Sequence, residues 1–132
     1  MFVFTVYLNI ALTAKRSGDF DFIIVDLENV FDEKSLQFLD AADRVVVVLN
    51  QSEAATYAVN NFVSNVNVHG QEKYFFVCNE YDKNAKNALS SGAYELKFNI
   101  NEYIEKINAE ISGNIEELSN IKGIRKLSVL FE

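Results

Sequence analysis

Short, continuous apolar runs constrain this chain more than any other feature of its sequence. The runs are rich in β-branched and aromatic residues and span Phe22–Val25, Arg44–Leu49, Tyr74–Cys78 and, more weakly, Tyr94–Phe98. A strand with one solvated face alternates apolar and polar residues, whereas a continuous run is typical of a strand buried on both faces. Such strands belong to parallel sheets. We therefore expect an α/β fold, a mostly parallel sheet flanked by helices.

Helical patterns separate these runs. The spacing of apolar residues predicts helices over 32–42, 53–66, 82–89, 101–111 and 115–127, of which the third is short and polar. Ser52 and Asn101 are placed to cap two of them. Strands that alternate with helices form βαβ units with right-handed crossovers. No linker, repeat or charge block divides the chain, so we predict a single α/β domain over residues 1–132.

Charge, cysteine content and the N-terminus exclude several classes of protein. The net charge of −7 disfavours direct nucleic-acid binding, which usually needs a basic face. The single cysteine, Cys78, rules out an internal disulfide framework and fits a reducing, cytoplasmic location. Residues 1–12 are apolar, but no positive charge precedes them and they are too short to span a bilayer. We expect them to begin a buried strand or helix, without membrane contact.

A polar residue closes three of the apolar runs. These residues are Asp26, Asn50 and Asn79. Parallel α/β sheets bind ligands beyond the carboxyl ends of their strands. An aspartate there can hold the Mg²⁺ of a bound nucleotide, and an asparagine amide can pair with a purine edge. The alternative is that each residue only caps the helix that follows it.

Several segments, taken in order, resemble one known family. They are FDFIIVD (Phe20–Asp26), AAD (Ala41–Asp43), the valine run, NQSE (Asn50–Glu53), VCNEYD (Val77–Asp82) and a closing Ile121–Leu127. This order resembles the Walker-B half of the ParA/MinD-type P-loop ATPases. The CpaE/TadZ pilus-assembly and localisation branch is nearest. The resemblance extends over roughly residues 16–132.

The resemblance implies roles for particular residues. Asp26 would lie beside the Mg²⁺ and the attacking water, and Asn79, with Asp82, would contact adenine. Complete members of the family bind ATP and dimerise, and the dimer places a complex at a pole, a membrane or DNA.

Two departures from the family pattern limit what the chain can do alone. No glycine stands in a G-x-x-x-x-G-K-[ST] phosphate loop, since Gly18 and Gly70 are isolated. Glu28 adds a negative charge near the position that the γ-phosphate takes in the family, which disfavours a triphosphate unless a cation intervenes. We therefore expect an incomplete P-loop NTPase (Rossmann-like) fold that lacks the phosphate-loop unit. It would be the C-terminal part of a localisation or assembly ATPase, inactive and without ATP or Mg²⁺ when alone. A homodimer or a partner protein would complete its sheet, because exposed sheet edges invite pairing.

Two other functions compete with this interpretation. Ser91–Lys97 (SGAYELK) faintly resembles the end of a receiver domain, which favours a non-catalytic interaction module, although the receiver's N-terminal acidic pair is absent. A small-molecule enzyme finds no support, because the sequence contains no acid–base constellation. His69, the single histidine, has no cysteine or second histidine near it, so we expect no tetrahedral zinc site there.

Overall fold

The structure, a computed structural model, describes residues 11–27, 32–68, 72–90, 92, 95–105 and 125. The chain divides into two compact units, Met1–Asp43 and Arg44–Glu132. The predicted single domain over residues 1–132 stays a prediction. The predicted helix over 115–127, apart from Arg125, lies outside the described residues, as do His69 and most of residues 1–12.

The described part of the first unit contains two short helical segments. Residues 11–17 are helical, and α2 spans Glu33–Ala41, which confirms the helix predicted over 32–42. Asp32 caps α2, because its carboxylate accepts the Ser35 backbone N–H at 2.8 Å. Lys15 donates to the Ala41 carbonyl at 3.0 Å and pairs with Asp43 at 2.7 Å. A cation at a helix C-terminus is favourable, so Lys15 helps to close α2.

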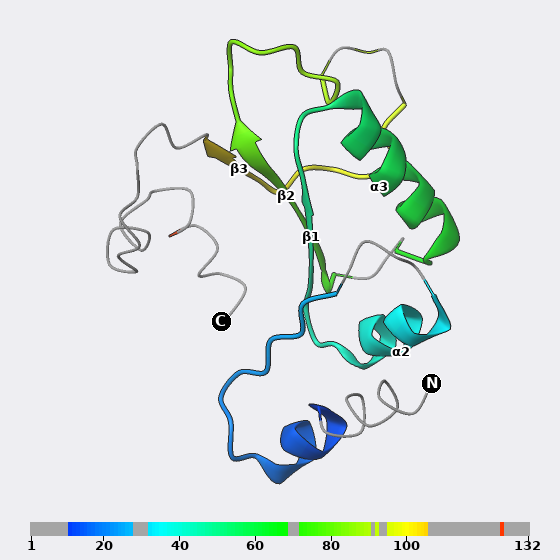
Figure 1. The fold of residues 1–132 in the computed structure, drawn as a ribbon, viewed down its shortest axis with the longest axis vertical. Coiled ribbons are helices and arrows are strands. Elements are labelled where there is room, and N and C mark those ends of the chain that lie inside the picture. The colour runs from blue at the N-terminus through cyan, green and yellow to red at the C-terminus, as the bar shows by residue number, and fades with distance from the viewer. Residues whose placement is uncertain are drawn as a thin grey trace. The chain divides into compact units, whose positions relative to one another are not determined.

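The second unit contains a three-stranded parallel sheet (Figure 1). Its elements are β1 (Val45–Leu49), α3 (Glu53–Asn65), β2 (Tyr74–Tyr81) and β3 (Glu102–Glu105), and its strand order is β1-β2-β3. Both pairings are parallel. This arrangement confirms the α/β class, the parallel sheet and the strands predicted from the second and third apolar runs. Ser52 caps α3 as expected, since its hydroxyl accepts the Ala55 N–H at 3.2 Å.

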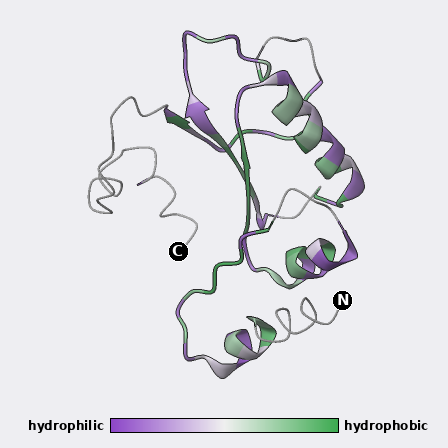
Figure 2. Ribbon diagram, in the orientation of Figure 1, coloured by the Kyte–Doolittle hydropathy of each residue, from purple (hydrophilic) through white to green (hydrophobic). Residues whose placement is uncertain are grey.

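The core of the second unit lies between α3 and one face of the sheet. Phe62 on α3 meets Tyr74 on β2 with ring centroids 6.2 Å apart, and Phe76 stacks on Phe98 at 5.0 Å. Alternation along a strand puts Tyr74, Phe76 and Cys78 on this face. Val77 points to the other face and is also buried. β2 is thus buried on both faces, as its continuous apolar run predicts. Figure 2 shows β1 in the green of hydrophobic residues and the end of β2 in the purple of hydrophilic ones.

β1 departs from that prediction. Val45 and Leu49 are buried, whereas Val46 and Val48 on the opposite face are exposed. A continuous apolar run indicates burial on both faces only when both faces have a cover, and among the described residues β1 lies at the edge of the sheet. The physical difference between β1 and β2 is therefore position in the sheet, not composition.

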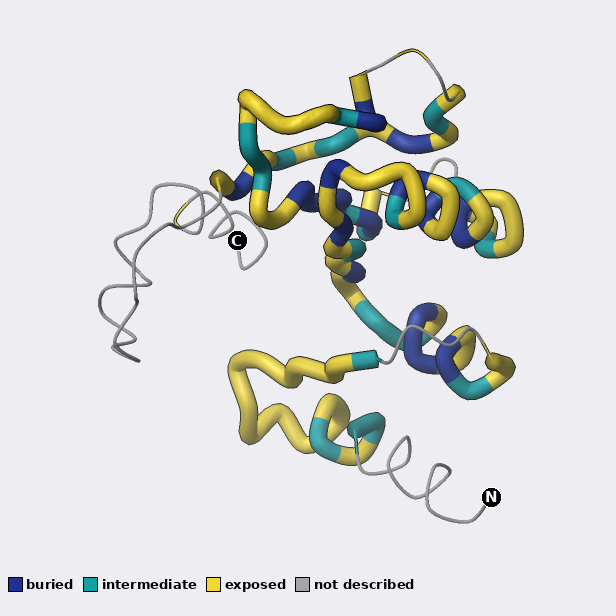
Figure 3. Tube along the Cα trace, turned by 45° about the horizontal axis from the view of Figure 1, so that its top comes forward, coloured by how far each residue is buried: buried dark blue, intermediate teal, exposed yellow. Residues whose placement is uncertain are grey.

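The predicted strand at Phe22–Val25 is wrong for this structure. Residues 18–27 form no helix or strand, and the apolar side chains of residues 20–25 are exposed, with Ile24 83% accessible (Figure 3). A β-rich run becomes a strand only when a neighbouring strand supplies backbone hydrogen bonds. No strand lies among the described residues of the first unit, so this run lacks such a neighbour there.

Two further predictions fail between β2 and the end of β3. Residues 82–89 form turns, because the side chains of Asp82 and Asn87 accept the backbone N–H groups of Asn84 and Leu89 and so compete with a helix. Residues 95–98 form no strand, because the Asn60 amide binds the Glu95 carbonyl and the Lys97 N–H, both at 3.0 Å.

The helix predicted from Asn101 is a strand where the structure describes it. The Asn101 backbone N–H donates to the Phe76 carbonyl at 2.9 Å, and its side-chain oxygen accepts the Phe76 N–H at 2.7 Å. These two bonds align the following residues with β2, so Tyr103 and Ile104 become part of β3. A long-range pairing thus overrides the local helical spacing.

Candidate functional site

The carboxyl ends of β1 and β2 lie side by side. Leu49 is paired with Cys78, so Asn50 and Asn79 follow at neighbouring positions of the two strands. Asn50 accepts the Ser52 N–H at 3.0 Å with its side-chain oxygen and thereby shapes the entry to α3. Asn50 directly follows β1 as predicted, whereas β2 continues through Tyr81, so Asn79 does not close its strand. The two residues still lie side by side near the carboxyl ends of the strands, where α/β proteins bind ligands.

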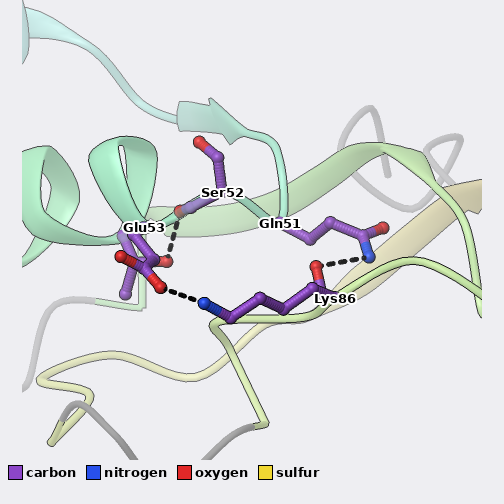
Figure 4. A network of polar contacts seen from close by, with 5 residues as sticks. Gln51, Ser52, Glu53 and Lys86 are labelled. Atoms are coloured by element: carbon purple, nitrogen blue, oxygen red, sulfur yellow. Dashed lines mark hydrogen bonds and ion pairs between the residues drawn. The ribbon is translucent and has the colours of Figure 1, made fainter.

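The side chain of Gln51 joins the segment that follows β1 to the loop that follows β2 (Figure 4). Its oxygen accepts the Asp82 N–H at 2.7 Å, and its nitrogen donates to the Asp82 carbonyl at 3.0 Å and, at longer range, to the carbonyls of Ala85 and Lys86. The Gln51 carbonyl in turn accepts the Ala88 N–H at 3.0 Å. Gln51 is buried, so one amide satisfies several backbone groups of residues 82–88 that would otherwise need water.

An ion pair adds a weaker contact across the same edge. Lys86 pairs with Glu53 in the first turn of α3 at 2.5 Å (Figure 4). Both side chains are at least half exposed, and exposed pairs contribute only about 0–1 kcal/mol. The Gln51 amide therefore contributes more than this ion pair to holding the loop that follows β2 in place.

Asn79 and Glu80 form an irregularity at the end of β2. The register with β3 shifts between Cys78 and Tyr81, and Glu80 has φ of 54°. A left-handed backbone at a non-glycine residue is strained, and bulges often redirect side chains next to functional sites. Asn79 and Glu80 are both exposed, and the Asn79 side chain makes no hydrogen bond to the described residues.

Asp82 stabilises the turn that follows β2. One of its carboxylate oxygens accepts the Asn84 N–H at 2.8 Å, while its backbone is bound on both sides by Gln51. The alternative interpretation, in which each strand-end residue caps the following helix, does not hold for Asn50, because Ser52 is the N-cap of α3. Asn50 and Asp82 instead accept backbone N–H groups two residues further along the chain.

Asp26 belongs to the first unit. It follows the exposed residues 20–25 and is itself exposed. Asn50, Asn79 and Asp82 come together within the second unit. Asp26 lies in the first unit, which is described by itself.

Chemistry that needs a reactive side chain has little support at this edge. Cys78 is fully buried, and burial raises the pKa of its thiol, which makes it a poor nucleophile. Burial, with the charges of Cys78 and Tyr81, also raises the pKa of Tyr103. The described residues contain no group of three or more His, Cys, Asp or Glu side chains that could hold a metal ion.

Gln51 is the residue that sequence reasoning missed. It lies directly between Asn50 and the cap Ser52, in a stretch that reads as a polar turn. Its role depends on a loop that is more than thirty residues away in the chain, so no local pattern could reveal it.

Comparison with known protein families, curated proteins and solved structures found no match to this chain. Among the described residues, no helix has both the length and the apolar composition that a membrane span requires. The fold and the geometry of the carboxyl edge are therefore the basis for a functional proposal.

Proposed function

We propose that this chain is the Walker-B-side part of a ParA/MinD-like nucleotide-binding domain that serves localisation or assembly. One observation carries the proposal: parallel strands in sequential order bring Asn50 and Asn79 to adjacent positions on the carboxyl edge. In doubly wound folds each half of the sheet has its strands in sequential order, and ligands bind beyond this edge where the two halves meet. The outer side of β1 would be that meeting point.

The residues fit the base of an adenine nucleotide and not its phosphates. The exposed Asn79 amide can donate to and accept from a purine edge, and Asp82 lies at the other side of the bulge. No phosphate loop occurs in the sequence, so no backbone cradle is available for a triphosphate. Magnesium is usually held by one or two carboxylates together with substrate phosphates, and in this proposal Asp26 would supply the carboxylate. ATP hydrolysis by the chain alone is not expected.

Adenosine and Mg-ATP titrations, followed by backbone NMR, test this proposal. Adenosine should shift the amide signals of Asn50, Asn79 and Asp82 at millimolar concentration, and Asn79→Ala should abolish the shifts. Asn99→Ala, at another exposed asparagine, is the matched control and should leave them unchanged. Mg-ATP should bind no more tightly than adenosine.

Two outcomes would contradict the proposal. Absence of shifts at these residues would remove the base site. Mg-ATP binding at least tenfold tighter than adenosine, a difference of about 1.4 kcal/mol, would show that the chain builds a phosphate site without a phosphate loop.

A second candidate function is a non-catalytic protein-interaction module. It is favoured by β1, an apolar edge strand with Val46 and Val48 exposed. The receiver-like segment SGAYELK adds nothing to this candidate, since Ser91, Ala93 and Tyr94 lie outside the described residues.

A further inference from the structure

One edge of the parallel sheet is open among the described residues. β1 pairs with β2 on one side, and no described strand lies on its other side. Val48 is 61% exposed and Val46 is 42% exposed. Natural edge strands are usually protected by charges, proline or a bulge, but Val45–Leu49 contains no charged residue and the chain has no proline. An edge strand without this protection is a site where another strand can pair.

The chain also carries an exposed segment suited to that role. Phe20–Val25 contains an aromatic and β-branched run, and its most exposed residues alternate: Phe20 is 61% and Ile24 83% accessible, against 41% for Ile23 and 43% for Val25. This alternation is the pattern of an extended strand with two faces. The segment forms no strand in the single chain.

We infer that the chain self-associates by strand addition, in which residues 20–26 of one copy pair with the open edge of β1 in a second copy. The donor segment and the acceptor edge are both present on every copy, so no other protein is required. Added strands gain affinity from main-chain hydrogen bonds and specificity from alternate side chains.

The pairings already in the sheet favour the parallel direction, since β1–β2 and β2–β3 are both parallel. When Asp26 is aligned with Asn50 in this direction, Ile24 falls beside Val48.

This pairing has a consequence for the carboxyl edge. It places Asp26 of the copy that donates residues 20–26 next to Asn50 of the copy that supplies β1, so two copies together would assemble the three candidate residues Asp26, Asn50 and Asn79. The inference rests on the interaction-module candidate and names its partner as a second copy of this chain.

Sedimentation analysis of the nucleotide-free chain over a range of concentrations tests the inference. The chain should form dimers or larger assemblies, and Val48→Asp or Ile24→Asp should weaken association at least tenfold, because each places a charge in an apolar pairing. Tyr57→Asp is the matched control, since Tyr57 is 63% exposed and lies on α3 and not on β1. It should leave association unchanged. Circular dichroism verifies that each variant stays folded.

Cross-linking identifies the paired segments. Copies with Ile24→Cys are mixed with copies with Val48→Cys and oxidised, and a disulfide between positions 24 and 48 should join two chains. Copies with Tyr57→Cys in place of Val48→Cys should not cross-link. The native Cys78 is buried and should not interfere.

Three results would overturn the inference. They are a strictly monomeric chain at all concentrations, association insensitive to both Val48→Asp and Ile24→Asp, and closure of the 24–48 disulfide within one chain that carries both cysteines. Because no nucleotide is present, failure here is separable from failure of the adenosine titration.

Discussion

The two units of this protein use similar apolar sequences in opposite ways. The second unit buries its runs: Val77 and Cys78 on β2 are almost inaccessible to solvent. The first unit leaves Phe20–Val25 exposed and, among its described residues, buries only Ser35, Phe38 and Leu39 on α2. The difference shows that apolar, β-rich composition specifies a strand only where a second strand is available to pair with it.

The largest expected effect comes from the same substitution made once in each unit. Phe76→Ala should lower the free energy of unfolding by about 3–5 kcal/mol, because it empties a buried site and removes the stack on Phe98. Phe20→Ala, at an exposed position, should change it by less than about 0.5 kcal/mol. Urea denaturation at low protein concentration measures both. Equal costs would mean that the first unit buries its run after all.

The next largest effect is expected at Gln51, whose amide holds residues 82–88 in place. Gln51→Leu keeps the volume but removes the amide that pairs with Asp82, and should cost about 1–3 kcal/mol. Hydrogen exchange at residues 82–88 should accelerate. Gln37→Leu on the exposed face of α2 is the matched control and should be nearly neutral. If the backbone amides of residues 82–88 stay protected from hydrogen exchange in Gln51→Leu, the Gln51 amide does not order this loop.

A smaller effect is expected at the cap of α3. Ser52→Ala removes the acceptor for the Ala55 N–H and should cost about 1 kcal/mol. Ser64→Ala near the other end of α3 removes only a hydroxyl that donates to the Asn60 carbonyl and to which Lys97 donates, both at exposed positions. Thermal unfolding should therefore shift more for Ser52→Ala than for Ser64→Ala, and the reverse order would contradict the capping role.

Lowering the pH should weaken the Asp32 cap of α2 but not the Ser52 cap of α3, because only the aspartate carboxylate titrates. The Ser35 backbone N–H, as the main cause, lowers the pKa of Asp32 below its ordinary value of 3.8. A lowered folded-state pKa means that this cap is fully effective above pH 3.8 and is lost as the pH falls through the folded value. Residue-specific NMR should show the start of α2 loosening in acid before the start of α3. Simultaneous loss would point to global unfolding instead.

The sequence predicted the α/β class, the parallel sheet, the helices α2 and α3 and the two main strands. These elements follow from local information: helical spacing, the caps Asp32 and Ser52, and apolar runs long enough for a strand. It predicted that Asn50 and Asn79 would share an edge, because carboxyl ends of parallel strands meet. Errors arose where a distant group intervened, as at residues 95–98, which Asn60 holds, and at Asn101, which pairs with Phe76.

What the sequence determined by itself was therefore the set of local elements and the residue types at the strand ends. Only the tertiary structure decided which runs became strands, that β1 lies at an edge, and that Gln51 fastens residues 82–88. The physical reason is that helices and their caps are satisfied within a few residues, whereas a strand or a buried amide needs hydrogen-bond partners that the fold alone brings near.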